Sequence, residues 1–137
     1  MTQKVSIRVA AGLGCDRGTP LATIEQALAE ALALVGLESG QIAALATINA
    51  KADEAAFLAL AANRGWPLQF YTAEELAQVP VPNPSEIVRR YMGTPSVSEA
   101  AALLAAGNDL SGLLVEKHKL RGPDGRNATV SLARFPQ

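Results

Sequence analysis

Three short apolar runs alternate with three helix-like segments in the first half of the chain. Apolar and polar residues alternate from Val5 to Val9, and the runs Ile42–Ile48 and Leu68–Tyr71 have the length of single strands. Such alternation with short connections favours a parallel sheet covered by helices, because each helix returns the chain to the same edge of the sheet. The order of elements therefore predicts an α/β fold.

Each helix in this half begins at a recognisable N-terminal signal. Thr19 and Pro20 signal a helix start, since Thr19 is able to cap and proline at the first helical position gives up no needed N–H. The helix is predicted to run from Leu21 to about Val35. The second helix follows Asn49–Glu54, and the third follows Thr72–Glu75, which has capping-box spacing. The sequence thus predicts that strand ends and helix N-termini lie together.

The second half of the chain is organised differently. Pro80–Gly93 predicts an extended proline connector followed by a short helix, and Ser96–Gly107 predicts an alanine-rich helix. Leu113–Lys117 and Thr129–Ala133 are predicted strands, separated by the turn-forming segment Arg121–Gly125. The 137 residues are therefore expected to form one domain, a three-layer α/β/α fold with a mostly parallel sheet and a C-terminal antiparallel hairpin.

Composition limits the classes of partner. With 12 basic and 13 acidic residues the formal charge is -1, which gives no basic face for nucleic acid. Alanine-rich stretches are interrupted well before the roughly 20 apolar residues that span a bilayer, so no membrane partner is expected. Cys15 is the sole cysteine, and residues 1–11 lack the apolar region of a signal peptide. We expect a cytoplasmic protein without disulfide, metal or cofactor.

The segment Gly12–Thr19 joins the first strand to the first helix. Its glycines allow backbone N–H groups to approach a ligand closely, and a helix N-terminus favours an anion there. Arg17 can add a bidentate clamp on a carboxylate or phosphate. A dinucleotide-binding loop requires glycine at position 17, and a P-loop requires lysine at position 18, so both nucleotide motifs are incomplete. The alternative is that the glycines only shape a tight turn.

Two further segments carry cations that can reach the same edge. Lys51 follows the second strand and, in a parallel sheet, is expected beside the glycine segment. The alternative interpretation is that Lys51 is a solvated surface charge, while Asp53 and Glu54 only complement the helix dipole. Lys117 and Lys119 are predicted at the end of a strand, where they are candidate carboxylate anchors.

Catalytic candidates are fewer. His118 is the sole histidine and is able to transfer protons near neutral pH, but it is equally consistent with an ordinary polar residue. Cys15, near a helix N-terminus, is a candidate nucleophile or a small buried hydrophobe. Ser98 and Glu99 are candidate ligand contacts, although helix capping explains part of their pattern.

Five blocks of sequence, taken in order, resemble a known family. They are Gly12–Thr19, Lys51–Glu54, Ser96–Leu104, Leu114–Lys117 and Thr129–Arg134. Their order and spacing are similar to those of the cobalamin-biosynthesis family represented by CobE and the C-terminal domain of CbiG. The resemblance covers nearly the whole chain, and a free-standing copy of this kind is similar to CobE.

The resemblance implies a role in corrin-ring synthesis. The leading hypothesis is a protein that binds a polycarboxylate corrin or precorrin intermediate, with other corrin-pathway enzymes as candidate partners. The alternative is a hydrolase that opens the ring A lactone of a precorrin-5A-type substrate, with His118 or Glu99 activating water. We expect this chain to lack the additional N-terminal region of those hydrolases, and Asn49 stands where the family leads us to expect aspartate, so binding is the favoured hypothesis.

The candidate site residues fall into two groups. The expected substrate-binding residues are Gly12, Gly14, Cys15, Arg17, Gly18, Thr19, Asn49, Lys51, Ser98, Glu99, Lys117 and Lys119. The candidate catalytic residues are His118, Glu99 and Cys15. The hypothesis requires that the chain reversals after neighbouring strands gather positive charge and free amides into one rim.

Overall fold

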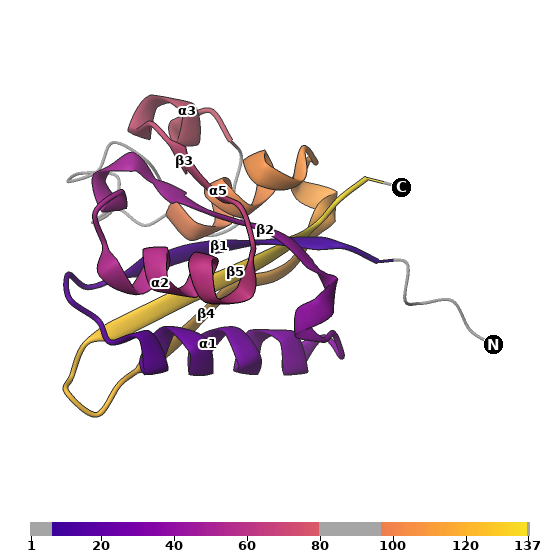
Figure 1. The fold of residues 1–137 in the computed structure, drawn as a ribbon. Coiled ribbons are helices and arrows are strands. Elements are labelled where there is room, and N and C mark those ends of the chain that lie inside the picture. The colour runs from indigo at the N-terminus through magenta and orange to yellow at the C-terminus, as the bar shows by residue number, and fades with distance from the viewer. Residues whose placement is uncertain (1–6, 80–96, 137) are drawn as a thin grey trace.

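The computed structural model describes residues 7–79 and 97–136, in which five strands form one sheet with helices on both faces (Figure 1). The strands are β1 (Val9–Cys15), β2 (Ile42–Ile48), β3 (Leu68–Tyr71), β4 (Leu113–Arg121) and β5 (Asn127–Arg134). The helices are α1 (Leu21–Leu34), α2 (Ala55–Arg64), α3 (Ala73–Ala77) and α5 (Val97–Ala106), with short 3-10 turns at Ser39–Gln41, Asn49–Lys51 and Leu110–Gly112. Within these residues, no helix combines the length and the apolar character needed to cross a membrane.

The sheet has the strand order β3-β2-β1-β5-β4. β1 pairs in parallel with β2, and β2 in parallel with β3, whereas β5 is antiparallel to both β1 and β4. All strands except β5 therefore run in one direction, and their carboxyl ends lie at one edge, which we call the carboxyl edge. In Figure 1 this edge, on the left, carries the β1–α1 loop and the β4–β5 turn. The predicted α/β class and C-terminal hairpin are confirmed.

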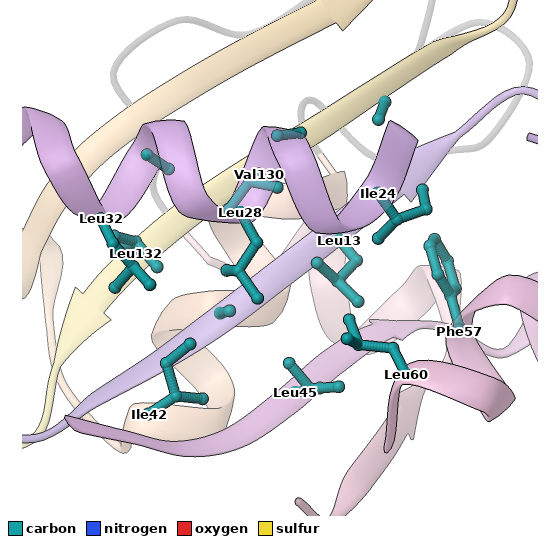
Figure 2. Packing of buried hydrophobic residues seen from close by; sticks show 14 of the residues in the cluster. Leu13, Ile24, Leu28, Leu32, Ile42, Leu45, Phe57, Leu60, Val130 and Leu132 are labelled. Atoms are coloured by element: carbon teal, nitrogen blue, oxygen red, sulfur yellow. The ribbon is translucent and has the colours of Figure 1, made fainter. Parts of the chain in front are cut away.

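Large aliphatic side chains fill the space between the sheet and helices α1 and α2. Figure 2 shows Leu13 and Val130 of the sheet packing against Ile24 and Leu28 of α1, with Phe57 of α2 at the end of the row. Each of these side chains is at most 3% exposed. Because full burial of such a side chain contributes roughly 1.5–3 kcal/mol, this layer is the main hydrophobic core.

Helix α5 packs on the opposite face through small residues. Ala10 and Ala133 are neighbours in the sheet, and both belong to a buried cluster with Ala106 of α5. At Gly12 the helix approaches so closely that a methyl group there would overlap the backbone oxygen of Ser98. Gly12 is therefore required by the approach of two backbones, and it places the first turn of α5 near the carboxyl edge.

Two predicted strands had incorrect boundaries. β1 continues through Gly12–Cys15, which had been expected to form a loop. This strand is central and covered on both faces, so its residues are buried consecutively and give no alternating signal. β4 continues to Arg121, so Lys117 and Lys119 lie within the strand and not at its end.

The predicted helix caps have mixed outcomes. Pro20 occupies the N-cap position of α1, which has no side-chain cap, so the expected capping role of Thr19 is wrong. The capping box of Thr72 and Glu75 is confirmed at α3. The predicted connector and short helix at Pro80–Gly93, and the capping role of Ser96, lie outside the described residues.

Candidate functional site

Three connections meet at the carboxyl edge. They are the β1–α1 loop (Asp16–Pro20), the segment Asn49–Glu54 between β2 and α2, and the β4–β5 turn (Gly122–Arg126). α1 and α2 begin directly after the first two, and α5 begins beside Gly12, so three helix N-termini face this edge. Helix N-termini present unbonded backbone N–H groups and favour negative charge. The edge is therefore suited to an anionic ligand.

The buried carboxylate of Glu54 joins the first two connections. Its side chain is 3% exposed, and Oε2 accepts a hydrogen bond from the backbone N–H of Gly18 at 2.9 Å. Its other oxygen, Oε1, lies 3.2 Å from Nη1 of Arg17 and 3.9 Å from Nζ of Lys51. Gly18 has a φ of 81°, a conformation that favours glycine. Glu54 therefore gathers the loop and both candidate cations around one carboxylate.

Arg17 uses its donors within the protein. Nη1 donates to Oδ1 of Asp53 at 2.8 Å, and Nη2 donates to the backbone oxygen of Ala50 at 3.3 Å. The hydrogen bond and the charge of Arg17 hold the pKa of Asp53 below its usual value, and the same pair raises the pKa of Arg17. Lys51 and Arg17 do lie together, as expected, but their charges face carboxylates. The rim is thus a set of paired charges, which corrects the expected excess of positive charge.

The β4–β5 turn and the first residue of β5 hold the β1–α1 loop from its other side. The carboxylate of Asp16 accepts hydrogen bonds from the backbone N–H and the side-chain amide of Asn127, at 2.8 and 3.1 Å. Nε of Arg126 donates to the backbone oxygen of Arg17 at 3.1 Å. The buried hydroxyl of Thr19 donates to the backbone oxygen of Asp16 at 2.7 Å. Thr19 therefore orders this loop from within.

A row of three residues crosses the sheet beside the start of α5. Gly14 of β1 pairs with Thr129 of β5, which pairs with Lys119 of β4. Paired residues share a face, and Gly14 shares the α5 face with Gly12, two positions earlier. A methyl group at Gly14 would meet only Thr129, at 3.8 Å, so the surface there is open. The structure thus brings exposed Lys119 level with the glycine segment.

Lys117 and His118 lie elsewhere. Nε2 of His118 is 2.7 Å from Oε1 of Glu30 on α1, so His118 points to the face opposite α5. Lys117 lines a hollow of about 430 Å³ with residues that include Leu34 and Val35, at the far end of α1 from the carboxyl edge. A β-bulge between Val115 and His118 interrupts the regular alternation of side chains between the two faces of β4.

The remaining candidates differ in burial. Asn49 is exposed at the carboxyl edge, whereas Glu99, in the first turn of α5, is fully buried. Oγ of Ser98 lies 2.9 Å from Oγ of Ser131, and this contact links α5 to β5. Burial raises the pKa of the half-buried Cys15 thiol, an effect only partly offset by the charge of Lys51. A protonated thiol is a poor nucleophile, which favours the structural interpretation of Cys15.

Sequence reasoning missed several residues that build this edge. Glu54 was interpreted only as a complement to the helix dipole, and Asp16, Asn127 and Thr129 were not singled out. Asp16 and Asn127 are 111 positions apart, so no local pattern reveals their contact. Among the described residues, no group of three or more His, Cys, Asp and Glu side chains is placed to hold a metal ion.

Comparison with known proteins gives consistent matches. Residues 9–133 match the family described as Cobalamin synthesis G C-terminus. The chain is 36% identical over 128 residues to the Cobalt-precorrin-5A hydrolase of Priestia megaterium, which covers 93% of this chain and 32% of that protein. It is 38% identical over 118 residues to Protein CobE of Sinorhizobium sp, which covers 85% of this chain and 76% of that protein.

A solved structure supports the same assignment. The crystal structure of CobE, a protein from the cobalamin biosynthetic pathway, has a TM-score of 0.80 and 31% identity, covering 99% of this chain and 96% of that chain. The chain spans about a third of the length of the hydrolase that it matches. Because the family match covers almost every described residue, the chain belongs to the cobalamin-biosynthesis family of CobE and the CbiG C-terminal domain.

Proposed function

We propose that this chain binds a polycarboxylate corrin or precorrin intermediate at the carboxyl edge of its sheet. The observation that carries the proposal is that three helix N-termini, the β1–α1 loop and the Lys51 side chain all lie at this edge. Anionic groups are favoured at helix N-termini, and a cation beside them strengthens the preference. The family's place in cobalamin synthesis supports a ligand of this chemical class.

The chemistry of such a ligand fits the edge. A corrin precursor is a large amphipathic disc fringed by acetate and propionate groups. It requires a flat surface and several donors at its rim. Gly14 and Thr129 offer an open surface beside the start of α5, with Lys119 at its outer end. A second hollow, of about 330 Å³ and lined by Gly18 and Glu54 among others, lies between the starts of α1 and α2.

A spectroscopic titration tests the proposal. Micromolar addition of the protein to metal-free corrins of the hydrogenobyrinic type should change their visible spectrum. Arg17→Glu should weaken binding, because it places a third negative charge beside Asp53 and Glu54. Lys117→Glu makes the same charge reversal far from the carboxyl edge, and it should leave the affinity nearly unchanged. Absence of binding to every pathway intermediate would remove the proposal.

A second candidate function is hydrolysis of the ring A lactone of a precorrin-5A-type substrate. It is favoured by the name of the Priestia megaterium relative, although that protein is about three times as long as the matched region. The two candidate bases have other surroundings, since His118 is paired with Glu30 and Glu99 is fully buried. Incubation of the purified protein with the lactone decides it: an intact lactone, with and without cobalt in the ring, excludes independent catalysis.

A further inference from the structure

Two cations approach the same carboxylate, but their surroundings differ. Arg17 is 59% exposed, and it donates hydrogen bonds to Asp53 and to the backbone of Ala50 in addition to its contact with Glu54. Lys51 is only 17% exposed, and its nearest carboxylate oxygen, on Glu54, is 3.9 Å away. Among residues 7–79 and 97–136, Lys51 has that ion pair alone and donates no hydrogen bond. The more buried cation is therefore the less satisfied one.

This arrangement is unusual for a charged group. An ammonium has three N–H donors, and burying it without acceptors costs free energy unless water or a ligand supplies them. Glu54 satisfies this need only partly, because Oε2 is bonded to the Gly18 amide and Oε1 lies closer to Arg17 than to Lys51. A carboxylate entering beside the β1–α1 loop would provide a charged acceptor for Lys51.

We infer that Lys51 is the cation that takes an acid group of the ligand, while Arg17 orders the loop through Asp53 and Glu54. The inference rests on the proposed function and deepens it, because it assigns different roles to two residues of the same edge. It also predicts specificity: Lys51 needs a hydrogen-bond acceptor with negative charge, so a free acetate or propionate group satisfies it better than the corresponding neutral amide.

The test compares matched substitutions that remove one charge each. Lys51→Met keeps the length of the side chain and should weaken binding of a hydrogenobyrinic-type polycarboxylate by about 10- to 100-fold, as expected for a lost hydrogen bond to a charged group. It should also reduce the salt dependence of the affinity, a change that a purely structural role would not produce. Lys51→Arg should retain much of the affinity. Arg17→Met and Asp53→Asn should each change it by less than about fivefold, because their ion pair is exposed.

The possible results separate the inference from the function on which it rests. If the natural protein binds and Lys51→Met binds equally well, with unchanged salt dependence, the assignment of Lys51 is wrong and the proposed function stands. If the natural protein does not bind, both fall. Thermal unfolding of each variant checks that it is folded, and Lys51→Gln, which keeps a polar end, replaces the methionine variant if that one unfolds.

Discussion

The two faces of the sheet are built in different ways. Between the sheet and helices α1 and α2, large side chains such as Leu13, Leu28 and Phe57 fill the space. Beneath α5 the chain uses Ala10 and Gly12, which allow two backbones to approach. A volume-filled face provides hydrophobic stability and tolerates changes of shape that conserve volume. A close-packed face instead fixes the position of a helix on the sheet, and here it sets where the N-terminus of α5 lies relative to the carboxyl edge.

Phe57→Ala tests the volume-filled face. Phe57 is fully buried, so its truncation should lower the free energy of unfolding by about 3–5 kcal/mol through lost burial and a cavity. Urea denaturation measures this loss, and Phe57→Leu should recover much of it. A loss below about 1 kcal/mol would mean that this face is not the main source of stability.

Gly12→Ala tests the close-packed face, with Gly14→Ala as its matched control. A methyl group at Gly12 overlaps the Ser98 backbone, which cannot rotate away, so we expect a loss of about 3 kcal/mol. The same methyl group at Gly14 meets only an ordinary contact and should change stability by less than about 0.5 kcal/mol. Equal losses, compared by urea denaturation, would contradict the distinction between the two glycines.

Ser131→Ala tests the polar contact that joins α5 to the sheet. The Ser131 hydroxyl lies 2.9 Å from that of Ser98, and it donates to the backbone oxygen of Glu116 at 2.5 Å. Its removal should lower the free energy of unfolding by about 1–2 kcal/mol, because the Ser98 hydroxyl remains buried. Val130→Ala, the next residue on the opposite face, gives the comparison: it should act through lost volume and not through lost hydrogen bonding.

Asp53→Asn should give the smallest effect on stability, and the size of this effect should depend on pH. Arg17 lowers the pKa of Asp53 in the folded protein, so the charged carboxylate stabilises the fold above its unfolded value of about 4. This contribution disappears as the pH falls through the folded pKa. The variant should therefore melt slightly below the natural protein at pH 7, and the two melting temperatures should converge below about pH 4. A difference in melting temperature that grows as the pH falls would contradict the stabilising role of the charged Asp53 carboxylate.

Local patterns predicted the elements more successfully than the site. The strand Ile42–Ile48 and the capping box at Thr72 carry their signals within a few residues, and both were recovered from sequence. The extent of β1 was not, because a central strand covered on both faces loses its alternation. The bulge in β4 likewise separated Lys117 from Lys119 without a signal in the sequence.

The gathering of Lys51 and Arg17 at one edge followed from the parallel topology and was predictable. The contact of Arg17 with Glu54 was not, since it depends on the orientation of two side chains that are far apart in the sequence. His118 was placed beside the site by sequence proximity to Lys117 and Lys119, but strand geometry turns it toward Glu30 on α1. Sequence order therefore predicted which residues lie near the carboxyl edge. The direction of each side chain, which the sequence did not reveal, determines which of them face that edge.

The central claim is that acid groups on the ligand are what the carboxyl edge recognises. Equilibrium titration with two corrins of equal size, one with free acetate and propionate groups and one with those groups converted to amides, tests it directly. We predict that the acid form binds at least about tenfold more tightly at low salt, and that added salt narrows the difference. Equal affinity for the two corrins, at every salt concentration, would contradict the account.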